Sequence, residues 1–203
     1  MPANNLRFVR RFRTYPAPKN IGVQPDCKIW QAIRATMAAP CLFKAIEIPS
    51  TGEIPECFAD GGLGCNNPSL EVVREAAQLF GDNCTVSVFL SIGAGHPGII
   101  KLPKSADVWQ KLIQALDGIA TDCERIADDL KHRCSSIPDI YFRLNILHGA
   151  AMVPHDEWSK SGEMLTHTRA YLQADDVSRN IDLIAKHLCN VPPSSITLAA
   201  MGK

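Results

Sequence analysis

Residues 58–68 constrain the fold of this chain most, because a short apolar run, a glycine turn and a helix start follow one another there without a break. Asn67 can cap the helix, and Pro68 suits its first position. Residues 69–80 then carry apolar side chains at helical spacing. The sequence therefore predicts that Asp60 lies on a turn between a strand and a helix, which is where an α/β enzyme keeps a catalytic acid or base.

Two glycines, Gly61 and Gly62, follow Asp60 directly. Glycine can adopt positive φ and lets another group come close to the backbone, so the Asp60 side chain can face a shared cleft. An Asp-Gly pair in an ordinary surface turn has the same sequence. This motif by itself leaves both interpretations open.

The overall charge balance argues against a chain built to bind polyanions. The 203 residues carry 21 Lys and Arg against 21 Asp and Glu, so the net charge favours neither nucleic acid nor an anionic membrane. Residues 6–15 depart from this balance by interleaving basic and apolar side chains, a pattern that predicts a strand with one basic face and leaves a phosphate-binding site as the alternative. The basic residues of this cluster are Arg7, Arg10, Arg11 and Arg13.

The eight cysteines show no metal-binding pattern. No two of them form a Cys-x-x-Cys pair, and no set has the spacing of zinc ligands. His132 and Cys134 lie close in sequence, but a polar helix end accounts for them. We therefore expect reduced thiols, no metal and no cofactor.

Membrane-spanning and export signals are absent from the sequence pattern. The first five residues lack the apolar core of a signal peptide, and no run of about 18 apolar residues exists to span a bilayer. We expect a cytoplasmic protein whose contact with membranes, if any, is peripheral. The sequence does not define an oligomeric state.

Strand and helix patterns alternate along the chain, which predicts an α/β fold with a mainly parallel sheet flanked by helices. Residues 85–92 are nearly continuously apolar or small, as in a strand buried on both faces. The longest helical pattern covers residues 105–134, where Gly118 can divide it. The other expected strands are 43–48, 57–59 and 140–147, and the other expected helices are 25–37, 69–80, 163–172 and 176–189.

A Gly-x-Gly-x-x-Gly pattern at residues 93–98 is the pattern of dinucleotide-binding loops. Its surroundings do not fit, because Asp117 lies inside a helical pattern instead of ending a second strand, and Pro97 removes an amide. We expect a glycine turn that binds no nucleotide. His96 follows the carboxyl end of a strand, where α/β proteins bind ligands, but a solvated loop histidine is the preferred interpretation.

A hydrolase needs a nucleophile and an oxyanion hole besides a base. The chain contains no Gly-x-Ser-x-Gly elbow, and Ser69, Ser87 and Ser91 occupy helix-start or strand positions. No glycine-rich stretch before Asp60 can supply oxyanion amides. Only the base of such a site is recognisable from the residues.

Three motifs, in this order and approximate spacing, resemble the patatin-like phospholipase family. They are the helix and strand at residues 30–43, the Asp60 turn with the Asn-Asn-Pro sequence that follows it, and the strand end at residues 90–95. The resemblance runs from about Leu6 to Asn145, and the residues beyond 150 match only loosely.

The resemblance implies a partial patatin-like fold, with residues 1–150 as the C-terminal portion of the domain and residues 151–203 as a helical extension packed on it. It implies hydrolysis of acyl esters in lipids by a Ser-Asp dyad whose base corresponds to Asp60. The implied partners are a lipid or acyl-ester substrate and a membrane touched peripherally, without nucleic acid. The residues that support the Asp60 motif are Gly61, Gly62, Asn66 and Asn67.

In that family the serine elbow and the glycine-rich oxyanion loop precede the region that this chain resembles. The chain therefore looks like the C-terminal half of the domain, a truncated domain that carries the base and is expected to be inactive alone. Its status as an enzyme stays open at this point. The alternative is a noncatalytic lipid-binding or protein-interaction module that kept the fold.

We predict that the cysteines are reduced, because Cys57, Cys84 and Cys189 lie in or beside apolar strand and helix patterns. Mass spectrometry of protein isolated under rapid alkylation, with and without reductant, measures the oxidation state. A mass deficit of two hydrogens per cysteine pair that reductant reverses would contradict the prediction.

Overall fold

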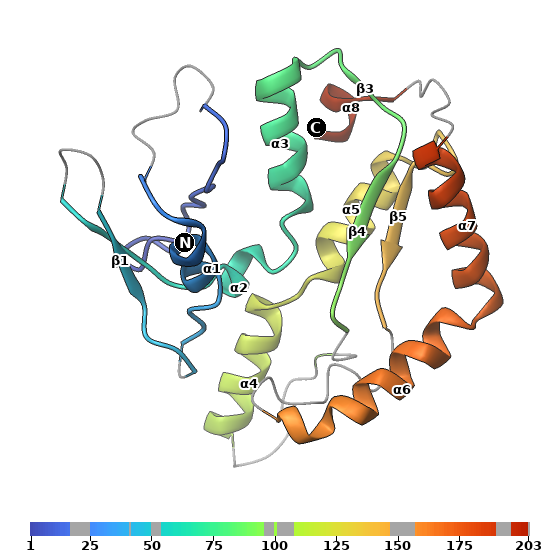
Figure 1. Cartoon of the computed structure of the whole chain (residues 1–203). Coiled ribbons are helices and arrows are strands. Elements are labelled where there is room, and N and C mark those ends of the chain that lie inside the picture. The colour runs from blue at the N-terminus through green and yellow to red at the C-terminus, as the bar shows by residue number, and fades with distance from the viewer. Residues whose placement is uncertain are drawn as a thin grey trace. The chain divides into compact units, whose positions relative to one another are not determined.

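The computed structural model describes residues 1–16, 25–40, 42–49, 54–95, 100, 108–146, 157–189 and 196–202. These residues form two compact units, and each unit is described by itself. Unit 1 comprises Met1–Asn66 and Ile119–Asp122, and unit 2 comprises Asn67–Gly118 and Cys123–Lys203. Figure 1 labels their helices and strands.

Unit 1 combines a helix with an antiparallel hairpin. Helix α1 (Ile29–Thr36) precedes strands β1 (Ile46–Ile48) and β2 (Glu56–Phe58), and the short helix α2 (Gly62–Cys65) follows them. The two strands pair with Ile46 opposite Phe58. Their connection is too short for the crossover that parallel strands need, so they run antiparallel. Both strands of this hairpin confirm the sequence prediction.

The core of unit 1 is small. Ile48 and Phe58 are fully buried and pack with Ala35 of α1. The ring of Phe12 meets Phe58 edge-on, with the centroids 5.2 Å apart. The apolar stripe of α1 faces solvent instead, because Ile29 is 74% exposed. Helix α1 is therefore held by its small Ala35 side and not by the stripe that the periodicity identifies.

The strand expected at residues 6–15 is absent, so this prediction was wrong. Arg10 forms an ion pair with Glu56 of β2, with 2.6 Å between Nη2 and Oε2. The guanidinium of Arg13 donates to the carbonyl of Arg11 at 3.2 Å, so a side chain takes a backbone acceptor that a neighbouring strand would need. Basic side chains that make such contacts can alternate with apolar ones in the sequence. The alternation of residues 6–15 therefore does not require a strand.

Unit 2 is built on one parallel pair of strands, β4 with β5, in which Phe89 lies opposite Tyr141 and Ile92 opposite Leu144. Helices α4 and α5 provide the crossover between them. A second pair, β3 with β6, is antiparallel. The elements in chain order are α3 (Ser69–Phe80), β3 (Thr85–Val86), β4 (Phe89–Ile92), α4 (Val108–Ala120), α5 (Glu124–Arg133), β5 (Tyr141–Leu144), the 3-10 helix η2 (Trp158–Lys160), α6 (Ser161–Leu172), α7 (Asp175–Cys189), β6 (Ile196–Thr197) and α8 (Leu198–Gly202).

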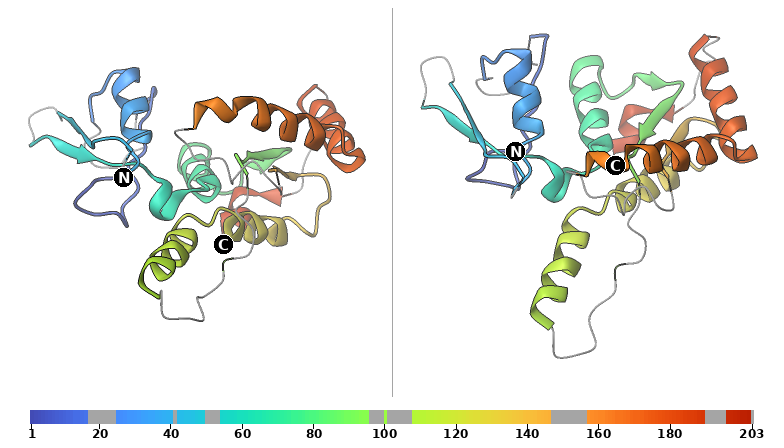
Figure 2. Two further views of the ribbon diagram at one scale, coloured as in Figure 1. Left: turned by 90° about the horizontal axis from the view of Figure 1, so that it is seen from below. Right: turned by 60° about the horizontal axis from the view of Figure 1, so that its bottom comes forward.

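The two faces of the β4–β5 pair differ in how they are covered. Successive side chains of a strand point to opposite faces. Phe142 meets His187 of α7 with the rings 6.2 Å apart, whereas Arg143 reaches Glu124 at the start of α5. Helices α7 and α5 therefore cover opposite faces, which can be followed in Figure 2. The face toward α7 is incompletely covered, because Ile92 of β4 is 72% exposed.

The main core of unit 2 lies among α3, α5, α8 and the strand pairs. Leu130 of α5 and Met201 of α8 are both fully buried there. The residues of this core are Val73, Leu130, Cys134, Ile140, Ile196, Leu198 and Met201. The C-terminal residues that the structure describes thus contribute directly to the interior of unit 2.

The chain is α/β as expected, but a mainly parallel sheet is not what the described residues form. They form three two-stranded sheets, of which β4–β5 alone is parallel. The strand expected at residues 85–92 divides, because its first part pairs with β6 and its second part with β5. The exposure of Ile92 also contradicts burial on both faces.

The long helical pattern divides as well, after Gly118 and not at it. The helix is interrupted where the carbonyls of Thr121 and Cys123 accept hydrogen bonds from the side-chain amides of Asn66 and Asn67, at 2.6 and 2.8 Å. These side chains satisfy carbonyls that a continuous helix would satisfy internally. The two later helices, α6 and α7, begin and end close to their predicted bounds.

Within the described ranges, we find no helix that combines the length and the apolar character needed to cross a bilayer.

We predict that Leu130→Ala lowers the free energy of unfolding of unit 2 by about 2–5 kcal/mol, because it removes a fully buried side chain and leaves a cavity. Leu188→Ala on α7 is the matched control, since Leu188 is 62% exposed. Urea unfolding followed by circular dichroism measures both variants. Equal losses in the two variants would contradict the assignment of Leu130 to the core.

Candidate functional site

Asp60 lies where the sequence places it, on the turn between β2 and α2. Its amide donates to the carbonyl of Ala38 at 3.0 Å, and the amide of Ala59 donates to the carbonyl of Met1 at 2.9 Å. Two segments that are distant in sequence therefore hold the backbone at this turn. Asp60 is half-buried. A carboxylate on a held backbone with one side open is suited to accept a proton from a bound group.

Gly62 leaves room for the Asp60 carboxylate, which lies against it. A Cβ at this position would come 2.9 Å from Oδ2 of Asp60, whereas a Cβ on Gly61 would meet nothing within 4 Å. Neither glycine adopts positive φ, in contrast to the expectation; among the described glycines of this motif, Gly64 does, with φ of 114°. The close approach expected at the glycine turn is therefore real, but the approaching group is the Asp60 side chain itself.

Asn66 and Asn67 each fix a carbonyl of the segment between α4 and α5. Asn66 donates to Thr121 within unit 1, and Asn67 donates to Cys123 within unit 2. Asn67 also accepts the amide of Ser69 at 3.2 Å, but it lies one residue before the N-cap of α3, so the predicted cap position was wrong. The adjoining proline precedes the first helical residue instead of occupying it.

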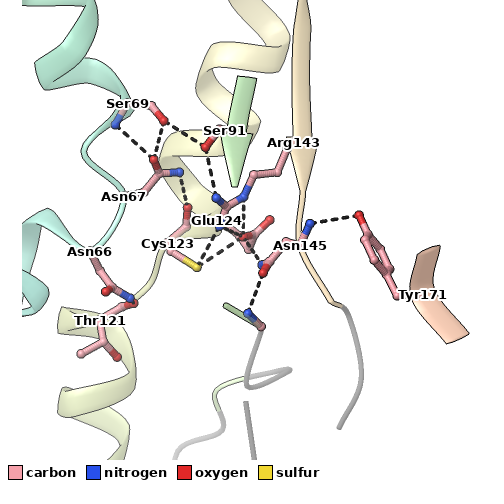
Figure 3. Close-up of polar contacts among 11 residues, drawn as sticks. Asn66, Asn67, Ser69, Ser91, Thr121, Cys123, Glu124, Arg143, Asn145 and Tyr171 are labelled. Carbon is pink, nitrogen blue, oxygen red and sulfur yellow. Dashed lines mark hydrogen bonds and ion pairs between the residues drawn. The ribbon is translucent and has the colours of Figure 1, made fainter. Parts of the chain in front are cut away.

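A chain of hydroxyl hydrogen bonds continues from Asn67 into β4 (Figure 3). The Ser69 hydroxyl donates to the Asn67 amide oxygen at 2.6 Å, because that oxygen can only accept. Ser69 Oγ must then accept from the hydroxyl of Ser91, 3.1 Å away. Ser91 Oγ in turn accepts from Nη1 of Arg143 at 3.1 Å. Both serines are buried, and their protons are assigned to structural partners.

Arg143 connects this chain to Glu124 at the start of α5. Its Nη2 lies 2.8 Å and its Nε 3.2 Å from Oε1 of Glu124. The Sγ of Cys123 lies 3.4 Å from the same Nη2. The side chains of the ion pair are 13% and 23% exposed, so the charges are largely removed from water. Arg143 thereby joins β4, β5 and α5 through one guanidinium.

The ionised form of Glu124 is favoured in this setting. Burial alone raises its pKa, but hydrogen bonds from Arg143, Cys123 and Asn145, together with the Arg143 charge, outweigh burial and hold the pKa below the ordinary value of 4.5. Burial and the neighbouring Glu124 raise the pKa of the Cys123 thiol. Cys123 is therefore a protonated structural thiol and not a thiolate nucleophile.

Asn145 ties the charge cluster to the turn that follows β4. Its Nδ2 donates to Glu124 at 2.7 Å, and its Oδ1 accepts the Gly95 amide at 2.7 Å. The backbone amide of Asn145 donates to the hydroxyl of Tyr171 in α6 at 3.0 Å. The side chain is almost completely buried, so all of these contacts form away from water.

The sequence motifs point to Asp60, Asn66 and Asn67, but they do not indicate the Arg143–Glu124–Asn145 cluster as a site. A signal was present in β5, because Arg143 and Asn145 occupy alternate positions and so lie on one face. Glu124 carried no comparable signal, since its helical pattern reads as continuous through the break. His96 lies outside the described residues.

The thiols Cys57, Cys84 and Cys189 are unpaired in the structure, and Cys189 is exposed, so it has no structural role in the core. In the part of the chain that the structure describes, no three His, Cys, Asp or Glu side chains are grouped in a way that could hold a metal ion. The described residues thus offer a half-buried carboxylate, Asp60, in unit 1 and a largely buried ion pair, Arg143 with Glu124, in unit 2.

We predict that acidification destabilises unit 2 through Glu124. Because its folded pKa is lowered, its stabilising effect is present above the ordinary value of 4.5 and is lost as the pH falls through the folded pKa. Glu124→Gln should lower the free energy of unfolding by roughly 1–3 kcal/mol at pH 7 and flatten its dependence on pH below the ordinary value of 4.5. Urea unfolding at a series of pH values measures this. Asp182→Asn, an exposed change on α7, is the control, and the same flattening there would contradict the prediction.

Comparison with known proteins supplies relatives of this chain. It is 33% identical over 126 residues to phospholipase A I of Arabidopsis thaliana, a match that covers 59% of this chain and 9% of the plant protein. It is 33% identical over 121 residues to calcium-independent phospholipase A2-gamma of Homo sapiens, covering 58% of this chain and 14% of the human protein. No protein-family model and no solved structure matches the chain.

The chain thus spans only about a tenth of the length of these relatives. Over the matched part, the relatives bear out the resemblance that the Asp60 turn and its neighbouring motifs predict. The chain is related in sequence to the patatin-like phospholipases.

Proposed function

We propose that this chain carries the general base of a lipid acyl hydrolase, and that the base is Asp60. The observation that carries the proposal is the turn itself, where the Asp60 carboxylate is packed against Gly62 and the backbone amide is held by Ala38. Relatives named phospholipases, 33% identical over 126 and 121 residues, support a lipid acyl hydrolase as the activity. The substrate class proposed is a lipid with an acyl ester bond.

The proposed reaction follows from the chemistry of a carboxylate base. Asp60 accepts the hydroxyl proton of a serine as the serine oxygen attacks the ester carbonyl carbon. The tetrahedral intermediate collapses to an acyl-serine, and Asp60 returns its proton to the alcohol portion of the lipid as it leaves. Water then attacks the acyl-serine while Asp60 takes its proton, and that proton passes to the serine oxygen as the fatty acid is released. Two backbone or side-chain donors must stabilise the oxyanion in both steps.

The nucleophile must come from outside the residues that the structure describes here. Ser91 accepts from Arg143 and donates to Ser69, so its proton is already engaged in a structural hydrogen bond. Ser69 donates to Asn67 and is equally buried. Neither has a base beside it, and no Gly-x-Ser-x-Gly elbow occurs in the 203 residues. The proposal is therefore a base that acts together with a serine from another segment.

The same resemblance suggests how the chain is organised. We propose that residues 1–150 correspond to the C-terminal portion of a patatin-like domain, and that residues 151–203 are a helical extension of it. Contact with lipid is proposed to be peripheral. The competing function is a noncatalytic lipid-binding or interaction module, and the experiments below distinguish the two.

We predict that the 203-residue chain alone hydrolyses neither p-nitrophenyl esters nor phospholipids above background, since a base without a nucleophile and oxyanion donors forms no acyl-enzyme. Turnover is measured on purified protein, and a fluorophosphonate probe reports any reactive serine. Turnover that Asp60→Asn abolishes, together with labelling by the probe, would show that this chain holds its own nucleophile.

A chimera tests the base directly. Residues 6–145 of this chain replace the matching segment of Arabidopsis phospholipase A I, and ester hydrolysis is measured. Asp60→Asn in the chimera should lower kcat by about 10²–10⁴-fold, the contribution typical of a general base. Asp26→Asn, an exposed change in the same unit, is the control and should leave kcat unchanged. An active chimera that tolerates Asp60→Asn would refute Asp60 as the base and favour the noncatalytic alternative.

A further inference from the structure

The turn Gly93–Ala94–Gly95 leaves the carboxyl end of β4 and is held at both ends by residues near the end of β5. The Gly93 amide donates to the Leu144 carbonyl at 2.8 Å, and the Gly95 amide donates to Oδ1 of Asn145 at 2.7 Å. Gly95 adopts φ of 129°, a conformation that favours glycine. The turn is therefore specified by its own glycines and by one side chain of β5.

The space beside Gly93 is already filled. A Cβ there would collide with Oδ1 of Asn145 and would lie 2.5 Å from Nη2 of Arg143. Glycine is needed at this position because two polar side chains lie where a Cβ would project. By contrast, a Cβ on Gly162 would meet nothing within 4 Å, so Gly162 offers a matched control.

The orientation of Asn145 is set by its partners. Glu124 Oε1 can only accept, so the Asn145 amide nitrogen faces it and the amide oxygen is left for the Gly95 amide. Glu124 is in turn held by two nitrogens of Arg143. A charge pair, an asparagine and a turn thus form one connected path, drawn in Figure 3.

We propose that Arg143, Glu124 and Asn145 are positioning residues that hold the Gly93–Ala94–Gly95 turn in one conformation, so that its backbone forms a preorganised wall at the carboxyl edge of β4 and β5. The proposal concerns unit 2 alone. It stands or falls independently of Asp60 and of ester hydrolysis.

Amide hydrogen exchange of the full chain tests the proposal, with the Phe89 amide as internal reference because it donates to the Ile140 carbonyl at the other end of β4. In Asn145→Ala the Gly95 amide should exchange at least about tenfold faster relative to Phe89, because its acceptor is gone. Asn83→Ala, an exposed change, is the control. Parallel acceleration of both amides would show a general loss of stability and overturn the positioning role.

A second variant reaches the same turn without removing the asparagine. Gly93→Ala should displace Arg143 and Asn145 and accelerate Gly95 exchange to a similar extent, while Gly162→Ala leaves it unchanged. The double variant Gly93→Ala/Asn145→Ala should add little to either single variant, because both act through one contact. A Gly95 amide that stays protected in Gly93→Ala would refute the proposal even if Asn145→Ala does not fold.

The charge dependence of the turn provides a readout that packing alone would not move. The charged or titratable groups that interact with Glu124 include Arg143, the Cys123 thiol and the Tyr141 hydroxyl. Acidification should therefore shift the Gly95 amide resonance as Glu124 takes up a proton, and this titration should vanish in Glu124→Gln. A Gly95 signal that titrates identically in both proteins would contradict the connection between Glu124 and the turn.

Discussion

The ion pair between Arg143 and Glu124 is the interaction on which the rest of unit 2 depends. Its two side chains are mostly removed from water, and losing one partner destabilises the fold because the other charge is left uncompensated. Arg143 comes from β5 and Glu124 from the first turn of α5. The pair therefore fixes how the crossover returns to the parallel strands, and Ser91 and Asn145 are oriented by the hydrogen bonds that complete it.

At two positions glycine is favoured because a polar side chain lies against the backbone, and not because the backbone adopts a conformation that favours glycine. Gly62 gives space to the Asp60 carboxylate, and Gly93 gives space to Arg143 and Asn145. Neither belongs to the glycines that adopt positive φ among the described residues, which are Gly64, Gly81 and Gly95. In both units a polar side chain lies on a bare backbone at the start of a turn. The glycine backbone thus limits the orientations that the Asp60, Arg143 and Asn145 side chains can adopt.

The parts predicted well from sequence depend on contacts between near neighbours. Helix α3 begins two residues after Asn67 and ends just before Gly81, at the bounds that the helical periodicity predicts. The bounds of α6 and α7 also lie close to those predicted from periodicity. The β1–β2 hairpin was visible from a short apolar run on each side of a turn-rich connection. The strand expected at residues 6–15 failed, because its alternation arises from side-chain contacts such as that of Arg10 with Glu56.

The sequence by itself determined the helices with clear ends, the hairpin of unit 1, and the place of Asp60 between a strand and a helix, since each of these follows from residues a few positions apart. Tertiary structure decided the division of the long helical pattern, because the carbonyls at its break are satisfied by Asn66 and Asn67, more than fifty residues away. It also decided that the apolar run at residues 85–92 pairs with two different strands. The Arg143–Glu124–Asn145 cluster arose in the same way, because charge compensation between distant residues leaves no local period in the sequence.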